Sequence, residues 1–314
     1  MSPKRVIAFA AVALVVYGGV AVWVLNQPDF EIPEIRGTAW IYLVLALVAY
    51  LGAMWFYGLL FRESVHRSGG EVKAWSAFKA ALVGAGVARL IPAGGAITPV
   101  ALAWAVRGET ERAAGPALRT VMLNYAGLLI MAGGGLLVAR PREGTQVASV
   151  SLVIVAPIVL IVGLVLMFGS GKLASLNKYL PRFVRNRLAS SVVNHAPGLE
   201  SQAYVWARLA LEGVTLWLVL EAFSLDINGF QVMASFAVSS LAGGLPGTPG
   251  GLGVTEVGLA LILAAYGIPG TRTAVPIIVF RVISYWVPAA LGFLAGGTTF
   301  LKSKEAEEAA EVSR

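Results

Sequence analysis

Long apolar runs separated by short polar stretches dominate this chain of 314 residues. A hydrocarbon core about 30 Å thick is crossed by a helix of about 20 apolar residues. Lys4 and Arg5 precede the first such run, and no small-residue cleavage site follows it, so we interpret that run as a retained anchor. Runs of this length predict spanning helices at 6–25, 39–61, 118–139, 148–168, 203–225 and 274–297.

Two further apolar regions do not fit a simple span. Region 75–106 is interrupted at 91–95, and region 230–266 is interrupted at 245–253, in both cases by proline and glycine. Proline lacks a helical N–H and glycine loses more backbone entropy, so neither interruption continues a helix. Short arms around such a break predict re-entrant hairpins or discontinuous helices. Irregular backbone is tolerated at membrane depth only inside protein or beside a wet cavity.

The two interruptions resemble each other. Residues 92–103 align without gaps on 249–260, and each stretch is followed by a helix with an early arginine and a later tyrosine. Interrupted segments at corresponding places of two halves predict an inverted repeat around a transport site. Chance similarity is the alternative, because glycine and alanine are common in membrane helices. The identical pairs are Pro92/Pro249, Gly94/Gly251, Thr98/Thr255, Val100/Val257, Leu102/Leu259 and Ala103/Ala260.

The pattern therefore predicts an all-α, polytopic integral membrane protein, a helical bundle with two Pro/Gly-broken re-entrant hairpins in an inverted repeat. We expect a single membrane domain at 1–297, with repeat halves at roughly 38–140 and 203–297. A cytoplasmic amphipathic segment at 169–200 is expected to link the halves, because its apolar residues recur at helical spacing and its basic residues fall largely elsewhere. A short polar cytoplasmic segment follows at 298–314.

Composition narrows the class of protein. Hydrophobic residues make up 57% of the chain and charged residues 13%, whereas a soluble domain is about 25% charged. This excludes a soluble enzyme, a nucleic-acid-binding domain and a disordered chain. The chain has no cysteine, which excludes disulfides and thiolate metal ligands. We predict no metal and no other cofactor.

The distribution of charge predicts an orientation. With a cytoplasmic N-terminus, sixteen lysines and arginines fall on inside segments and four on outside loops. This positive-inside bias explains the net charge of +7 without nucleic acid. We therefore expect a multi-pass protein of the cytoplasmic membrane with both chain ends in the cytoplasm. In this topology the two hairpins enter from opposite sides.

Ionisable residues inside a membrane are costly and mark functional sites. Glu256 follows the second break and Arg281 lies about two turns into the next helix, where they could bind an anionic headgroup or form an ion pair that fixes packing. Arg208 and Glu212 lie four residues apart on one helix and are spaced to pair, for structure or for function. Three others lie near the ends of apolar segments, where we expect them to reach the interface: Lys79, Arg119 and Glu221.

The residues that we predict to bind the substrate lie at the two breaks. Half-helix N-termini present unpaired N–H groups and a partial positive charge, which suit a phosphate or another anionic group. The alternative is that the breaks only permit tight helix packing. Around the second break we predict Glu256, Arg281, Tyr285, Gly250, Gly251, Gly253 and Thr255. Around the first break we predict Arg89, Gly94, Gly95, Thr98 and Tyr125, with Arg208 and Glu212 as the intramembrane pair.

The second break carries a family resemblance. Residues 249–256 read Pro-Gly-Gly-Leu-Gly-Val-Thr-Glu, and Gly267-Ile268, Ala274 and the Arg-Val-Ile-Ser-Tyr-Trp of 281–286 follow. This resembles the lysylphosphatidylglycerol synthase transmembrane (flippase) family, whose pattern is PGGxGxxE, Gly-Val or Gly-Ile, an alanine and RxxxYW. The first break is similar to that family's first conserved region. Pro99 stands at the repeat position of Glu256, where relatives often have an acidic residue, so a two-carboxylate mechanism does not carry over.

The resemblance implies lipid handling by a stand-alone member without the soluble synthase domain. We expect a flippase or scramblase for an anionic phospholipid or a polyprenyl-linked lipid, and no enzymatic activity. One alternative is a membrane-embedded lipid-linked glycosyltransferase-like enzyme that uses outer-loop carboxylates at Asp29, Glu31 and Glu34. Another is a non-catalytic accessory subunit of a lipid or cell-envelope assembly. The expected partner is a membrane lipid and not nucleic acid; a homo-oligomer or an envelope-biosynthesis partner stays open.

Overall fold

The computed structural model describes residues 37–90, 94–139, 154–168, 197–244 and 249–296. These residues form helices joined by short turns, with no strand among them, so the expected all-α class is confirmed for this part of the chain. Several predicted features lie outside the described residues. They are the anchor at 6–25, the outer-loop carboxylates, most of the linking segment at 169–200, the polar segment at 298–314 and the first part of each interruption, at 91–93 and 245–248.

Four helices are long and apolar enough to cross a membrane, and they coincide with four of the predicted runs. The fourth of these is continuous over Gly270–Gly296; it begins as α13 (Gly270–Arg281) and contains a π-helical turn, η4 (Val282–Trp286). The other three are α2 (Ala39–Arg67), α5 (Ala114–Val138) and α10 (Leu199–Ala222). Of the predicted span at 148–168, residues 154–168 are described, mostly as α7 (Ala156–Phe168).

Each interrupted region forms two shorter helices. The first region contains α3 (Ala74–Leu90) and α4 (Gly94–Ala105). The second contains α11 (Gly229–Gly243) and α12 (Val254–Ala265), with a short 3₁₀ turn between them, η3 (Pro249–Gly251). The predicted breaks are therefore confirmed, because the helices end where proline and glycine interrupt the apolar pattern. Both halves show the same order of a long, two short and a long helix.

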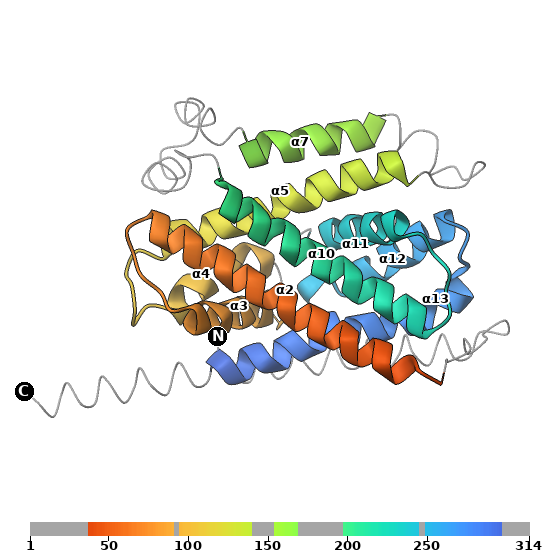
Figure 1. Ribbon diagram of the computed structural model, residues 1–314, viewed down its shortest axis with the longest axis horizontal. Coiled ribbons are helices and arrows are strands. Elements are labelled where there is room, and N and C mark those ends of the chain that lie inside the picture. Colours follow the sequence, from red (N-terminus) through yellow and green to blue (C-terminus); the bar gives the residue numbers. More distant parts are fainter. Residues whose placement is uncertain (1–36, 91–93, 140–153, 169–196, 245–248, 297–314) are drawn as a thin grey trace, which may run out of the picture.

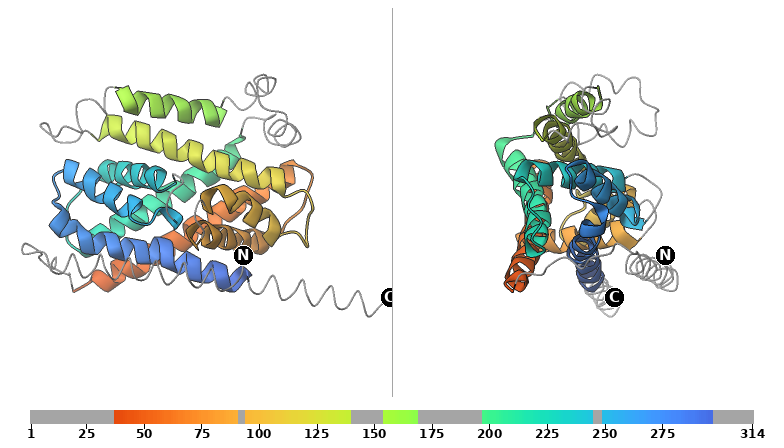
Figure 2. Two further views of the ribbon diagram at one scale, coloured as in Figure 1. Left: turned by 180° about the vertical axis from the view of Figure 1, so that it is seen from behind. Right: turned by 90° about the vertical axis from the view of Figure 1, so that its right-hand side faces the viewer.

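The two pairs of short helices lie at opposite ends of the molecule. In Figures 1 and 2, α3 and α4 occupy one end of the longest axis and α11 and α12 occupy the other. The helices α2 and α10 lie side by side and pack along much of their length, and α7 covers the outer side of α5. Between the pairs, α3 contacts η3, so the breaks of the two halves meet inside the bundle.

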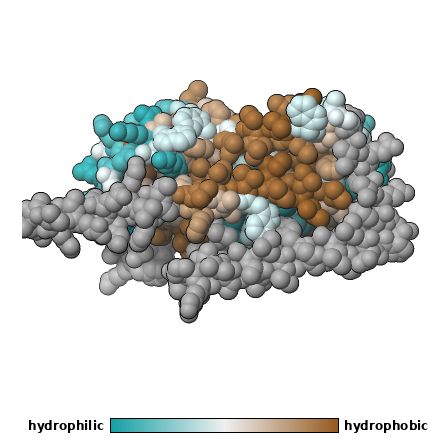
Figure 3. All heavy atoms as spheres, turned by 90° about the horizontal axis from the view of Figure 1, so that it is seen from below, coloured by the Kyte–Doolittle hydropathy of each residue, from teal (hydrophilic) through white to brown (hydrophobic). Residues whose placement is uncertain are grey.

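Small residues let these helices approach closely. A Cβ added at Gly58 on α2 would lie 2.8 Å from the backbone of Phe78 on α3, and one at Gly133 on α5 would lie 2.6 Å from the backbone of Leu160 on α7. Such close backbone approach is typical of packed membrane helices. Many large apolar side chains point outward instead, and the face in Figure 3 is hydrophobic across its middle and hydrophilic at one end. This surface suits a protein surrounded by lipid.

Candidate functional site

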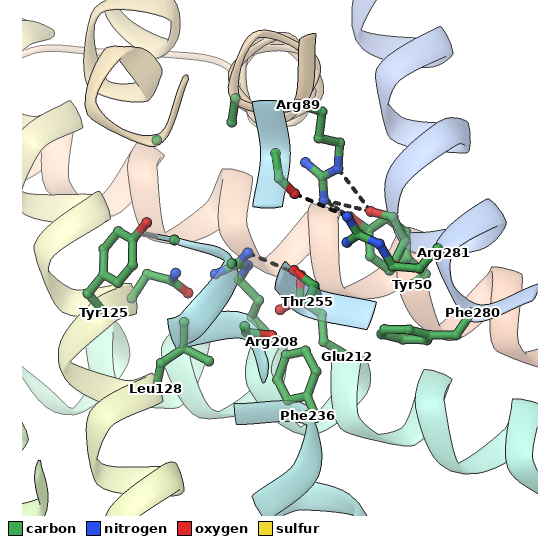
Figure 4. Close-up of a pocket in the computed structure, with 18 residues that line it drawn as sticks. Tyr50, Arg89, Tyr125, Leu128, Arg208, Glu212, Phe236, Thr255, Phe280 and Arg281 are labelled. Carbon is green, nitrogen blue, oxygen red and sulfur yellow. Dashed lines mark hydrogen bonds and ion pairs between the residues drawn. The ribbon is translucent and has the colours of Figure 1, made fainter. Parts of the chain in front are cut away.

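A cavity lies where the two pairs of short helices meet. Its volume is about 200 Å³, and all the described helices except α7 contribute to its lining (Figure 4). A second cavity of about 130 Å³ adjoins it, because the two share lining residues that include Arg89, Tyr125 and Arg208. Both volumes far exceed the roughly 10–15 Å³ that one water molecule needs. With arginines, a carboxylate and hydroxyls in their lining, these cavities suit water or a polar ligand.

Arg89 joins the end of α3 to the π-helical turn of the last helix. Its Nε and Nη2 donate to the Ser284 carbonyl at 2.9 and 2.7 Å, and Nη2 also donates to the Tyr50 hydroxyl at 2.6 Å. The Ser284 carbonyl is available because Pro288, four residues further on, has no N–H to donate. In return, the Tyr285 hydroxyl donates to the Arg89 carbonyl at 2.6 Å. Arg89 therefore fastens the first break to the second half.

Arg281 and Glu256 form an ion pair. This is one of the two roles that the sequence left open for them, the other being the binding of an anionic headgroup. Arg281 Nε donates to Glu256 Oε1 at 2.8 Å, and both side chains are largely buried. Arg281 Nη2 also donates to the Gly250 carbonyl at 3.1 Å, and its guanidinium lies 4.8 Å from the centre of the Tyr285 ring. These contacts fasten the second break to α13. Each buried charge is thereby compensated.

Gly250 brings the two breaks into direct contact. Its φ is 55°, in the left-handed region that glycine adopts at no steric cost. A Cβ added there would lie 2.8 Å from the Cα of Arg89 and 2.5 Å from Cε2 of Tyr285. Gly251 is similar, since its φ is 70° and an added Cβ would lie 2.5 Å from the Cα of Gly243 on α11. The glycine pattern of the second break is therefore required by packing as well as by backbone conformation.

Arg208 and Glu212 pair as their spacing predicts, with 3.1 Å between Arg208 Nη2 and Glu212 Oε1. The Arg208 guanidinium lies over the Tyr57 ring, 4.2 Å from its centre. Both members of the pair line the larger cavity, as Figure 4 shows. Nε and Nη1 of Arg208 are buried and have no hydrogen-bond partner among the described residues, and the same is true of Oδ1 of Asn124. This pair is therefore less completely satisfied than the contacts of Arg89.

The structure brings most of the predicted site residues together. Thr98 lines the adjoining cavity. Three others do not line the cavity, but they contact residues that do. They are Glu256, Tyr285 and Gly251. Gly94 begins α4 and Gly253 precedes α12, and neither is among the described lining residues. The predicted site residues that line the larger cavity are Arg89, Gly95, Tyr125, Arg208, Glu212, Gly250, Thr255 and Arg281.

Four polar residues that line the larger cavity were not predicted from the sequence: Tyr50, Asn124, Ser240 and Ser284. Asn124 carried a signal, because it is a lone amide within the apolar run at 118–139. Ser284 carried another, since Pro288 leaves its carbonyl without a helical donor. Tyr50 carried none, because aromatic residues in apolar runs most often pack or anchor at the interface.

Arg119 does not reach the interface, so that prediction was wrong. The residue is 8% exposed, and its Nη1 lies 3.3 Å from Glu63 Oε2 and 3.4 Å from Ser64 Oγ. Its Nη2 lies 3.5 Å from Ser201 Oγ. The physical reason is that Glu63, also buried, supplies a counter-charge inside the bundle. Glu63 lies 56 positions earlier in the chain, so helix spacing alone did not reveal the pair.

The chain matches a known family of membrane proteins. A family model described as the lysylphosphatidylglycerol synthase TM region matches residues 8–292. The chain belongs to this family. The matched range contains both breaks, the Glu256–Arg281 pair and the Arg208–Glu212 pair. The resemblance drawn from the second break is therefore confirmed over nearly the whole chain.

Curated relatives carry the name UPF0104 membrane protein. Two from Methanothermobacter thermautotrophicus are 35% identical over 82 residues and 30% identical over 99 residues, which cover 26% and 31% of this chain. One from Methanocaldococcus jannaschii is 30% identical over 88 residues, or 28% of this chain. The matches span only 25%, 28% and 26% of the relatives' own lengths. These names agree with a membrane protein, and the apolar helices of this chain agree with it as well.

Proposed function

We propose that this protein is a lipid transporter, a flippase or scramblase that moves an anionic phospholipid or polyprenyl-linked lipid between the leaflets of the cytoplasmic membrane. The observation that carries the proposal is the arginine-lined cavity between two interrupted helix pairs. Charged residues inside a membrane are costly and are found along substrate pathways. Membership in the lysylphosphatidylglycerol synthase TM family and the four apolar helices of spanning length support a lipid as the substrate.

The proposal includes an arrangement in the membrane. The pairs α3–α4 and α11–α12 are re-entrant hairpins that enter from opposite leaflets, and the two halves form an inverted repeat. Their placement at opposite ends of the molecule and the shared order of long and short helices support this arrangement (Figure 1). In such an arrangement the substrate site lies near the bilayer midplane, at the interface of the repeats. Both chain ends are then cytoplasmic.

The size of the cavity favours a headgroup over a whole lipid. Its volume of about 200 Å³ is below the roughly 300–1,000 Å³ of pockets that enclose a drug-sized ligand. Acyl chains would also gain little free energy by moving from the bilayer into the protein, because lipid tails are as apolar as leucine side chains. The headgroup therefore enters between the helix pairs while the acyl chains stay in the bilayer. Arg89, Arg208 and Arg281 supply the positive potential that a phosphate requires.

Reconstitution tests this proposal. Purified protein in liposomes that carry fluorescent phosphatidylglycerol in one leaflet is expected to speed its appearance in the other. Glu256→Gln and Arg281→Ala are expected to slow transfer by about tenfold or more, since a charge-assisted hydrogen bond of about 1.5–3 kcal/mol corresponds to that factor. Glu111→Gln is the matched control, because Glu111 is exposed and lies outside both cavities.

Two results of the reconstitution would contradict the proposal. If no lipid is moved and the same vesicles turn over a sugar-phosphate donor, the protein is a membrane enzyme and the transport proposal fails. If Glu111→Gln slows transfer as much as Glu256→Gln, the loss of transfer is not specific to the cavity, and the assignment of the cavity to transport fails.

A further inference from the structure

Three arginines line the larger cavity, and the protein uses them differently. Arg89 donates to the carbonyls of Ser284 and Ala85 and to the Tyr50 hydroxyl. Arg281 donates to Glu256 and to the Gly250 carbonyl. Arg89 therefore has donors committed to joining the first break to the second half, and Arg281 has donors committed to joining the second break to α13.

Arg208 differs from these two arginines. Nη2 donates to Glu212, whereas Nε and Nη1 are buried and have no partner within the described part of the chain. The guanidinium carbon lies over the Tyr57 ring, 4.2 Å from its centre. A contact of this kind with an aromatic ring uses none of the N–H donors, which are the groups of an arginine that bind phosphate and carboxylate oxygens. Buried donors without partners are rare in native proteins because their desolvation is not compensated.

The position of Arg208 places these donors beside the space for a ligand. Its side chain lines both cavities, so a group that enters either one meets the guanidinium. The Arg208–Glu212 pair is about nine-tenths buried, with 11% and 10% of the side-chain surfaces exposed. Charge interactions are strong in such a low-dielectric place. Glu212 neutralises Arg208 while the cavity holds no anion.

We propose that Arg208 is the phosphate-binding residue of the headgroup site, and that Glu212 is an internal counter-ion which competes with the phosphate for it. This inference rests on the proposed function, since the phosphate is that of the transported headgroup. Arg208 donates to the phosphate oxygens, and Glu212 recovers the guanidinium when the headgroup leaves. Competition of this kind keeps binding weak enough for release, while Arg89 and Arg281 hold the breaks in place.

A binding experiment in detergent tests this assignment. The probes are dihexanoyl phosphatidylglycerol, inorganic phosphate and, as a zwitterionic control, dihexanoyl phosphatidylcholine. The variants are Glu212→Gln, which removes the counter-ion, and the double variant Arg208→Gln/Glu212→Gln, which leaves no unpaired buried charge and so favours a folded protein. The dissociation constant of each probe is measured by titration of the full chain.

Loss of the Arg208 contact is expected to raise the dissociation constant of the anionic lipid about ten- to hundredfold in the double variant. Glu212→Gln is expected to lower it. Equal dissociation constants in the wild type and the double variant overturn the assignment, and so does a wild type that binds none of the probes. If inorganic phosphate displaces the lipid, the site binds the phosphate group alone. If it does not, the site also binds the glycerol of the headgroup.

The same variants separate this inference from the proposed function. If the wild type moves lipid in vesicles but the double variant binds phosphatidylglycerol as tightly as the wild type, transport stands and the role of Arg208 falls. If the wild type moves no lipid while the double variant loses binding, the anion site stands and the transport function falls.

Discussion

Two charged clusters lie between the same three helices, α2, α5 and α10, and differ in how completely their polar atoms are satisfied. On each helix the corresponding members are five to seven residues apart, or about 8–10 Å along the axis. The closed cluster consists of Glu63, Ser64, Arg119 and Ser201. The open cluster consists of Tyr57, Asn124, Arg208 and Glu212.

The difference lies in the neighbours of each arginine. In the closed cluster, serine hydroxyls and a carboxylate surround Arg119, and none of the cluster's described buried atoms lacks a partner. In the open cluster, the neighbouring breaks contribute glycines to the cavity wall, among them Gly95 and Gly244. Glycine has no side chain that could fill the space or accept from Arg208. Similar ion pairs therefore stabilise the fold in one place and leave room for a ligand in the other.

The largest expected effect comes from breaking the closed cluster. Arg119→Gln removes the partner of Glu63 from α5, and removing one member of a buried pair costs about 3–5 kcal/mol. Glu63 keeps its ion pair with Arg67 on α2, so the loss should lie near the low end of that range. We expect a lower free energy of unfolding and an unchanged preference for anionic lipid, measured by denaturation in detergent and by transfer in vesicles. The double variant Glu63→Gln/Arg119→Gln should recover part of the stability. An Arg119→Gln protein as stable as the wild type would contradict the closed cluster's structural role.

Two glycines of the second break, Gly250 and Gly253, differ in what surrounds them. Gly250 has φ 55° and ψ 26°, in the left-handed helical region, where alanine is strained by about 1–2 kcal/mol. Gly253 has φ 81° and ψ −46°, near the classic γ-turn conformation, where alanine is strained as well. An added Cβ meets Arg89 and Tyr285 at Gly250 but nothing within 4 Å at Gly253. Overpacking of about 1–3 kcal/mol is therefore expected at Gly250→Ala alone, and lipid transfer should slow in Gly250→Ala and not in Gly253→Ala. Equal effects in the two variants would show that contact between the breaks is unimportant.

The smallest expected effect comes from single hydroxyls. Ser201 Oγ accepts from Arg119 in the closed cluster, whereas Ser284 Oγ is buried beside the cavity and has no partner in the part of the chain that the structure describes. Ser201→Ala should lower the free energy of unfolding by about 0.5–1.5 kcal/mol, and Ser284→Ala should leave it unchanged or raise it slightly. Thermal unfolding of the two variants side by side measures this. A larger loss for Ser284→Ala than for Ser201→Ala would reverse the comparison.

Helices and breaks were predictable because both depend on local chemistry. The apolar runs that became α2, α5, α10 and the helix from Gly270 are long enough to be recognised without their neighbours. Proline and glycine mark the interruptions in the same way, and the glycine motif at 249–253 is a local requirement for positive φ at Gly250, Gly251 and Gly253. The pairing of Arg208 with Glu212 was also predictable, since helix geometry sets neighbours four residues apart.

The contacts within the site were less predictable. Arg281 with Glu256 and Arg119 with Glu63 are both buried ion pairs, but only the first lay beside a recognisable motif. The fastening of Arg89 to the Ser284 carbonyl joins residues 195 positions apart, so no periodicity reveals it. Long-range pairs of this kind depend on how helices cross, which a hydrophobic pattern does not specify.

By itself, the sequence determined that this protein is helical and membrane-embedded, where its helices are interrupted, and which family it belongs to, because apolar length, proline, glycine and short motifs act locally. Only the tertiary structure decided which of its buried arginines are satisfied. Arg89, Arg119 and Arg281 are matched with carbonyls, hydroxyls and carboxylates from distant segments, and Arg208 is left with unsatisfied donors beside the cavity. The physical reason is that a charge inside a membrane protein takes its role from the partners that packing brings to it.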